Sequence, residues 1–184
     1  MIILFEGPDG SGKSTLNAAI TEMLQKNGHQ VINSAREIWC EDKPTSPRRV
    51  TEPMMFKYLK TMVKDKQFYM YERGPISDNI YRVFDNYSPV TTINKFINFL
   101  AENEKQVFVI YCRTDLAEKK MLERGDENPV AIEKHKELTK IYDIVMRFVK
   151  EKFKYNFIRF DYSKRGSMKE VLDKIEQFAF MNVR

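Results

Sequence analysis

The amino-acid sequence predicts a three-layer α/β/α fold, in which a five-stranded parallel sheet lies between two layers of helices. Five short apolar runs alternate along the chain with longer segments of helical period, and this alternation implies right-handed crossovers between parallel strands. Two of the runs, Met1–Phe5 and Gln106–Cys112, are apolar at almost every position, as in strands that are buried on both faces. In such a sheet ligands bind at the carboxyl ends of the strands, so the residues that follow each strand are the first candidates for function.

The first half of the chain alternates between strands and helices. After the first strand, a helix is expected over Lys13–Gln25, because apolar residues recur there at helical spacing until Asn27-Gly28 ends it. From Ala35 to Val50 the pattern is lost, and a loop of this length usually has a function. The other elements expected here are the strands Gln30–Ser34 and Gln67–Tyr71 and the helices Glu52–Val63, Ser77–Phe84 and Thr92–Ala101.

The second half continues the alternation. The strand Gln106–Cys112 is its most apolar segment, and a long helix over Ala131–Phe153 has one continuous apolar stripe. The remaining elements are expected as a helix over Asp115–Glu123, a strand over Tyr155–Phe160 and a helix over Ser167–Phe180.

The composition fits one globular domain. The chain has 184 residues, and no repeat or linker divides residues 1–184. Hydrophobic residues make up 42% and charged residues 31%, a balance that argues against disorder. No stretch approaches the roughly 18 apolar residues of a membrane span. Cys40 and Cys112 cannot form a disulfide framework and no signal peptide is recognisable, so we expect a cytoplasmic protein. The net charge of +5 suits an anionic substrate and is compatible with nucleic acid.

A phosphate-binding loop follows the first strand. It is the segment Gly7-Pro8-Asp9-Gly10-Ser11-Gly12-Lys13-Ser14, which has the spacing of the phosphate-loop motif: a glycine, four residues, then Gly-Lys-Ser. The glycines allow a tight turn that directs several N–H groups toward one point, and the next helix adds the positive end of its dipole. Lys13 supplies a mobile charge for the outer phosphates, and the Ser14 hydroxyl can bind Mg²⁺. The residues expected to bind the cofactor are Gly7, Gly10, Ser11, Gly12, Lys13, Ser14 and Thr15.

The segment Phe5–Thr15 closely resembles the phosphate loop of thymidylate kinases. The resemblance implies a P-loop NTPase fold of the nucleoside monophosphate kinase type, with ATP and Mg²⁺ as cofactors. It also implies phosphoryl transfer to a deoxynucleoside monophosphate, with dTMP as the first choice, and a position for Asp9 near the acceptor nucleotide. Because the family often dimerises, it implies a possible homodimer.

An acid–arginine pair, Glu72-Arg73, follows the third strand. Glu72 can hold the water shell of Mg²⁺ or accept a proton from an attacking hydroxyl, and Arg73 can bind a phosphate through two hydrogen bonds. The segment is similar to the Asp-Arg-Tyr segment of thymidylate kinases, where a Ser and a Tyr follow at comparable distance, as Ser77 and Tyr81 do here. The Glu-Arg pair itself looks more like deoxynucleoside kinases, which leaves the acceptor open. The alternative is a strand-end ion pair without chemistry.

A short lid is expected at about residues 124–130, where a segment that contains Gly125 and Pro129 separates two helices. Related kinases place there a lid that closes on ATP and contributes an arginine, which makes Arg124 the candidate, with Lys120 one turn before it. The alternative is that Arg124 only caps the end of its helix.

Arg36 and Phe56 complete the expected acceptor site. Arg36 lies in a segment distantly similar to the Arg-Glu-Pro segment of thymidylate kinases, which implies a contact with the acceptor phosphate, and Arg48 and Arg49 lie near the same expected cleft. Phe56 can stack on a base. The alternatives are a solvated charge for Arg36 and a core side chain for Phe56.

The predicted function is ATP-dependent phosphoryl transfer to a deoxynucleoside monophosphate. The residues expected to act in catalysis are Lys13, Asp9, Glu72, Arg73 and Arg124, with Ser14 and Glu72 around Mg²⁺. Three alternatives stay open: a deoxynucleoside kinase, a kinase acting on a hydroxyl of a modified base in DNA, and a nucleotide-binding module without turnover. The two histidines have no ligand spacing, so no metal site made of protein groups alone is expected.

Overall fold

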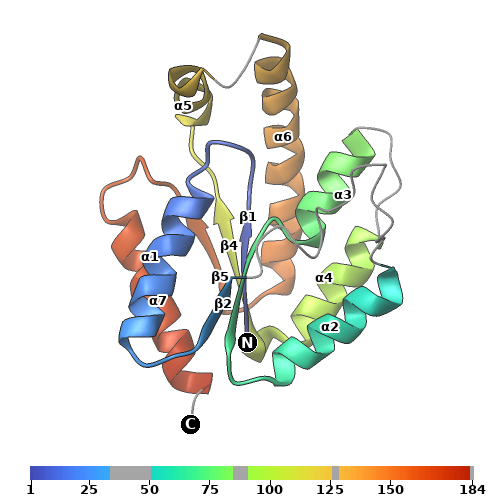
Figure 1. Cartoon of the computed structure of the whole chain (residues 1–184). Helices are drawn as coiled ribbons and strands as arrows, with labels where there is room; N and C mark the ends of the chain where they lie inside the picture. Colours follow the sequence, from blue (N-terminus) through green and yellow to red (C-terminus); the bar gives the residue numbers. More distant parts are fainter. Residues whose placement is uncertain (34–50, 85–90, 126–128, 183–184) are drawn as a thin grey trace.

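One parallel sheet organises the molecule. The computed structural model describes residues 1–33, 51–84, 91–125 and 129–182 (Figure 1). Five parallel strands lie in the order β2-β3-β1-β4-β5. They are β1 (Ile2–Glu6), β2 (Val31–Asn33), β3 (Phe68–Glu72), β4 (Val107–Cys112) and β5 (Phe157–Phe160). The predicted five-stranded parallel sheet is confirmed, and β1 lies at its centre, so the loop that follows β1 leaves the middle of the sheet.

Helices cover both faces of this sheet. α1 and α7 pack on one face, and α2, α3, α4 and α6 pack on the other (Figure 1). Their bounds, with α5 and the short 3₁₀ helix η1, are α1 (Lys13–Lys26), α2 (Glu52–Lys64), α3 (Pro75–Phe84), α4 (Ile93–Glu102), η1 (Glu104–Gln106), α5 (Ala117–Arg124), α6 (Pro129–Lys152) and α7 (Ser167–Asn182). The three-layer arrangement predicted from the alternation of elements is therefore confirmed.

The two helical layers explain why β1 is apolar along its length. Ile2 and Leu4 belong to the core cluster under α2, α3, α4 and α6, whereas Ile3 and Phe5 belong to the cluster under α1 and α7. Because successive side chains of a strand point to opposite faces, a strand covered on both sides needs an apolar residue at each position. The single carboxylate in this buried strand, Glu6, is therefore an exception that needs an explanation.

The start of α3 differs from the prediction by two residues. α3 begins at Pro75, not at Ser77, because proline has a helical φ and needs no hydrogen bond for a backbone N–H in the first helical turn. Only Arg73 and Gly74 then connect β3 to α3. This tight turn lies at the carboxyl edge of the sheet, next to the loop that follows β1.

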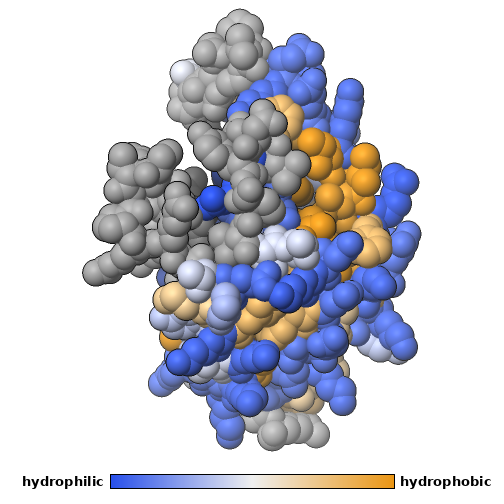
Figure 2. Space-filling view, turned by 90° about the vertical axis from the view of Figure 1, so that its right-hand side faces the viewer, coloured by the Kyte–Doolittle hydropathy of each residue, from blue (hydrophilic) through white to orange (hydrophobic). Residues whose placement is uncertain are grey.

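One face of the molecule is mainly polar. Figure 2 shows the face at the right of Figure 1, which is largely hydrophilic with an apolar area at its upper right. Exposed apolar side chains of α6 include Ile144 and Phe148, four residues apart on one helix face. Among the helices of the described residues, none is both long enough and apolar enough to cross a membrane.

Candidate functional site

The loop after β1 has a backbone that requires glycine. Gly7 has φ 146°, and a Cβ atom there would lie 2.1 Å from the carbonyl oxygen of Cys112 at the end of β4. Gly12 precedes α1 with φ 85°, and a Cβ atom there would lie 2.9 Å from the ring of Tyr162. L-residues rarely adopt these conformations. The loop is therefore packed between the ends of β4 and β5, with the N-terminus of α1 directly behind it.

Lys13 is the first residue of α1, and its side chain bends over the loop. The ammonium group donates to the carbonyl oxygens of Gly7 and Pro8, at 2.9 and 2.6 Å, and to the hydroxyl of Ser11 at 3.3 Å. Only 7% of Lys13 is exposed. The charge is thus held in the concave side of the loop, at the positive end of the α1 dipole, where the N–H groups also favour an anion.

Glu72, the last residue of β3, reaches α1. The Ser14 hydroxyl donates to Oε2 of Glu72 at 2.7 Å, and the side-chain amide of Asn17 donates to Oε1 at 2.9 Å. Glu72 and Ser14 were predicted from the sequence to share a site, whereas Asn17 was not recognised. The signal in the sequence is a polar residue one turn after Lys13 and next to Leu16 of the apolar stripe, and the structure shows that Asn17 is buried.

Arg73 faces the opposite side and pairs with Asp9. Its guanidinium forms an ion pair with one carboxylate oxygen of Asp9, and the Tyr81 hydroxyl donates to the other at 3.2 Å. The guanidinium carbon also lies 5.1 Å from the centroid of the Tyr81 ring, within cation–π distance. The backbone carbonyl of Asp9 lies 3.0 Å from Nε2 of His135 on α6. Asp9 is therefore the point where the phosphate loop, α3 and α6 meet.

Glu72 and Arg73 diverge because the backbone turns sharply between them and α3. Arg73 has φ 62°, a left-handed conformation that costs a non-glycine residue about 1–2 kcal/mol. Its N–H donates to the carbonyl of Phe5 at 3.0 Å, and the next N–H, that of Gly74, donates to the carboxylate of Glu6 at 3.0 Å. The structure therefore brings the two predicted residues to one edge, with Glu72 toward α1 and Arg73 toward Asp9.

Glu6 was not recognised from the sequence. Its carboxylate is fully buried, and burial raises its pKa from 4.5 to about 7, while hydrogen bonds from Ser77 and Gly74 and the charge of Lys13 act in the opposite direction. The available signal was a carboxylate at the end of an otherwise apolar run. Without the fold, that residue is read as the end of a strand.

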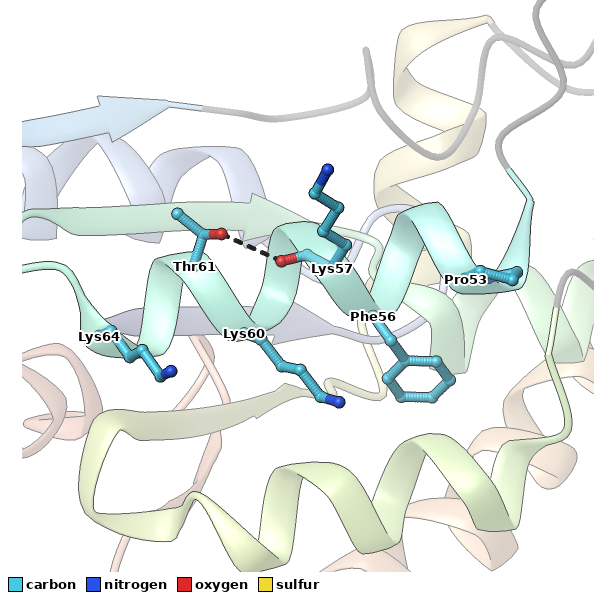
Figure 3. A pocket seen from close by; sticks show the side chains of 6 residues that line it. All are labelled: Pro53, Phe56, Lys57, Lys60, Thr61 and Lys64. Atoms are coloured by element: carbon cyan, nitrogen blue, oxygen red, sulfur yellow. Dashed lines mark hydrogen bonds between the residues drawn. The ribbon is translucent and has the colours of Figure 1, made fainter.

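Phe56 lies on α2 and points toward α4 (Figure 3). Its ring packs edge-on against Phe99, with ring centroids 5.4 Å apart, and the ammonium of Lys95 lies 5.7 Å from its centroid. It lines a groove of about 600 Å³ together with Pro53, Lys57, Lys60, Thr61 and Lys64 (Figure 3). These contacts are those of a half-buried core side chain, and stacking on an acceptor base stays a prediction.

Several predicted residues fall outside what the structure describes. Arg36, Arg48 and Arg49 fall in residues 34–50, which lie outside the described residues. Residues 126–128 of the expected lid also lie outside them. Arg124 ends α5, which Gly125 closes with a left-handed φ of 67°, but the Arg124 side chain is not among those described. The roles of Arg36, Arg124 and the lid stay predictions.

The Ser14–Glu72 pair fits a magnesium–nucleotide site. A hydroxyl and a carboxylate are oxygen ligands of the kind Mg²⁺ prefers, and Mg²⁺ usually completes its shell with water and substrate phosphates. Within residues 1–33, 51–84, 91–125 and 129–182 there is no cluster of three or more His, Cys, Asp or Glu side chains that could hold a metal ion. An ion at this place would thus depend on water and on the phosphates of the nucleotide for most of its ligands.

Comparison with known proteins gives matches at the level of structure. No protein-family model matches the chain, and no curated protein sequence matches it. The structure of the YorR protein from Bacillus subtilis in complex with phosphorylated GDP is similar, with a TM-score of 0.67 and 20% sequence identity over 96% of each chain. A deoxyadenosine kinase from M. mycoides, solved with dCMP and dCDP, has a TM-score of 0.54 and 19% identity over 96% of this chain and all of that one. The same kinase with dATP has a TM-score of 0.52 and 20% identity.

These likenesses, at identities of 19–20%, describe the fold. In this chain the fold consists of five parallel strands in the order β2-β3-β1-β4-β5, a glycine-rich loop between β1 and α1, and helices on both faces of the sheet. The chain has the three-layer α/β/α fold of P-loop NTPases.

Proposed function

We propose that the protein transfers the γ-phosphoryl group of Mg²⁺·ATP to a deoxynucleoside monophosphate, with dTMP as the preferred acceptor. One observation carries this proposal. The turn after β3 directs Glu72 to the Ser14 hydroxyl at the phosphate loop and Arg73 to Asp9 on the other side of the same loop. A magnesium-binding group and a phosphate-binding group therefore flank the place where the loop would hold the outer phosphates.

The donor side would act mainly through charge and position. The N–H groups of Gly10, Gly12, Lys13 and Ser14 would hold the β-phosphate at the positive end of α1, with Ser11 and Thr15 beside them. Lys13 would exchange its contacts with loop carbonyls for the β- and γ-phosphates, and Arg124 would add charge from the lid. Mg²⁺, when bound, neutralises the developing charge on the transferring group. Ser14 would bind that ion, and Glu72 would orient its water ligands.

The acceptor side favours a phosphate for a reason of proton balance. Each carboxylate oxygen of Glu72 already accepts a hydrogen bond from α1, and both oxygens of Asp9 are engaged by Arg73 and Tyr81. A phosphate oxygen is anionic at neutral pH and attacks without a general base, whereas a sugar hydroxyl must lose a proton. Arg73, helped by Arg36, would bind the acceptor phosphate, and Asp9 would orient Arg73.

A deoxynucleoside kinase is the second candidate, and one observation favours it. The charge of Arg73 is balanced by Asp9, and the Arg73 side chain is only 19% exposed. A neutral acceptor leaves this pair intact, whereas an acceptor phosphate competes with Asp9 for the guanidinium. Phosphoryl transfer to a hydroxyl of a modified base in DNA would be the same reaction with a larger acceptor.

An acceptor panel separates these possibilities. The purified protein is incubated with Mg²⁺·ATP and, separately, with dTMP, the other deoxynucleoside monophosphates, the deoxynucleosides and an oligonucleotide that contains hydroxymethylated pyrimidines. ADP formation is followed, and products are identified by mass spectrometry, with Lys13→Ala as the matched control. ADP formation that depends on dTMP and yields dTDP supports the proposal. Turnover only with nucleosides or the oligonucleotide selects the second candidate, and nucleotide binding without any acceptor-dependent product selects a non-catalytic module.

A further inference from the structure

Glu6 is a buried carboxylate that the proposed chemistry does not use. It is the last residue of β1, it has no exposed surface, and it lies one strand away from Glu72, because Phe5 pairs with Glu72 in the sheet. A carboxylate in such a place is retained only where donors satisfy it, since its desolvation is otherwise very unfavourable. The identity of those donors shows what Glu6 does.

Among the described residues, the donors to Glu6 are Gly74, which directly precedes α3, and Ser77, in the first turn of α3. Oε1 accepts the N–H of Gly74 at 3.0 Å, and Oε2 accepts the N–H of Ser77 at 3.1 Å and also the Ser77 hydroxyl. The Ser77 hydroxyl in turn accepts a hydrogen bond of 2.7 Å from the Tyr142 hydroxyl on α6. Glu6 thus binds the free N–H groups at a helix N-terminus, where the helix dipole also favours a negative charge.

The same contacts fix the conformation of Arg73. Its N–H is bonded to the carbonyl of Phe5 and the following N–H to the carboxylate of Glu6, so consecutive groups at the end of β1 hold both sides of the left-handed residue. Gly74 permits this close approach, because a Cβ atom there would lie 3.0 Å from Oε1 of Glu6. A conformation that is costly for arginine persists only where its surroundings hold it in place.

We propose that Glu6 is a positioning residue for the acceptor side, which holds the Arg73 turn and the start of α3 so that Arg73 reaches the acceptor while Glu72 stays at the phosphate loop. The inference rests on the proposed function, because it assigns Glu6 a part in acceptor use. Glu6 itself touches neither substrate. A backbone shift of about 1 Å at a binding group can change rates by about two orders of magnitude.

The test compares Glu6→Gln with the wild type for donor and acceptor separately. The amide keeps the size of the side chain but places an N–H group against one of the N–H donors of α3. We expect kcat/KM for the acceptor to fall by about 10-fold or more, since the geometry of Arg73 is disturbed. The dissociation constant of Mg²⁺·ATP, measured by titration calorimetry, should change by less than about 3-fold, because the loop and the N-terminus of α1 remain.

A second test variant and a control variant complete the experiment. Ser77→Ala removes the hydroxyl contacts with Glu6 and Tyr142 but keeps the backbone donors, so it should shift acceptor kinetics in the same direction by about 3-fold. It replaces Glu6→Gln in the comparison if that variant does not fold. Glu22→Gln, an exposed residue of α1 paired with Lys26, is the matched control and should behave as the wild type.

The outcomes separate the two proposals. If the wild type turns over and both variants keep its acceptor kinetics while only their melting temperatures fall, Glu6 is a structural residue and the inference is wrong. If donor affinity and acceptor kinetics fall equally, the separation of the two sides is wrong. If the wild type shows no acceptor-dependent turnover at all, the proposed function fails, and the inference fails with it.

Discussion

The proposed donor side and the proposed acceptor side of the site are built in different ways. The donor side is a short local segment, in which the loop after β1 and the first turn of α1 supply backbone N–H groups and the Lys13 ammonium. The acceptor side is assembled from distant parts of the chain, because Asp9, Arg73, Tyr81 and His135 converge from the loop, the end of β3, α3 and α6.

This difference decides what a substitution does. On the donor side, function depends on groups whose position the backbone fixes, so the loss of one charge should act on turnover directly. On the acceptor side, side chains hold one another through ion pairs and hydrogen bonds. A substitution there should change the kinetics for the acceptor only. A substitution at Glu6 should do so through the backbone contacts that hold Arg73.

Removal of the Lys13 charge should have the largest effect. Lys13→Ala should lower turnover by at least ~10²-fold, the usual scale for the loss of one preorganised charge contact in a transition state. The measurement is acceptor-dependent ADP release at saturating ATP. Lys26→Ala, which removes an exposed ammonium from the other end of α1, should stay within about 2-fold of the wild type. Near-normal turnover of Lys13→Ala would place the transferring phosphoryl group elsewhere.

The buried carboxylate should make stability depend on pH. The pKa of Glu6 is about 7 in the folded protein and 4.5 ordinarily, so the folded state keeps a proton that the unfolded chain has lost between these values. The stabilising contribution is complete below the lower value and is lost as the pH rises through the higher one. The unfolding free energy of the wild type, minus that of Glu6→Gln, should therefore fall by about 2 kcal/mol between roughly pH 5 and pH 8.

Denaturant titrations at several pH values measure this difference. The amino group of Met1 acts in the opposite sense, because burial lowers its pKa from 8.0 to about 6, and stability from this group is lost as the pH falls. That contribution is common to both proteins and cancels in the subtraction. Parallel curves for the wild type and Glu6→Gln would mean that Glu6 is charged in the folded protein throughout this range.

Arg73→Lys should separate the two sides of the site. Lysine keeps the charge but cannot bind a phosphate or carboxylate through two parallel hydrogen bonds. We expect KM for the acceptor to rise by about 10-fold, while the dissociation constant of Mg²⁺·ATP stays within about 2-fold. Steady-state kinetics and calorimetry measure the two quantities. An equal loss for ATP would show that Arg73 belongs to the donor side.

The smallest effect should come from Asn17. Asn17→Ala removes the hydrogen bond to Oε1 of Glu72 but leaves the Ser14 contact, so kcat should fall by about 3- to 5-fold. The concentration of Mg²⁺ that gives half-maximal activity should rise, because Glu72 is less well oriented. Asn27→Ala, near the exposed end of the same helix, is the control. An unchanged Mg²⁺ dependence would mean that Ser14 alone orients Glu72.

The layers of the fold and the glycine-rich turn after β1 could be predicted from the sequence for a physical reason, whereas the roles of the residues in that turn stay predictions. Gly7 and Gly12 are required by backbone conformations and close contacts that leave a fixed spacing in the sequence. The alternation of apolar runs similarly follows from burial on both faces of the sheet. Local rules of this kind can be applied without knowledge of the fold.

The contacts between the predicted site residues could be predicted only in part. Asp9, Glu72 and Arg73 were recognised one by one, but their pairing depends on contacts between residues more than 50 positions apart. Glu6 and Asn17 were missed, because the role of a buried polar residue depends on its hydrogen-bond partner, and these partners are distant in the sequence. The start of α3 was predicted two residues too late, so the short turn at Arg73 and Gly74 was not predicted.

The most direct test of the central claim is titration calorimetry of the wild-type protein with ATP in the presence of Mg²⁺. The backbone N–H groups of the loop, with Lys13 and Ser14 beside them, should give one saturable site with a dissociation constant between roughly 1 μM and 1 mM, the usual range for such substrates. Saturable heat at one site per chain is the predicted result. No heat and no saturation with any purine nucleoside triphosphate would contradict the account.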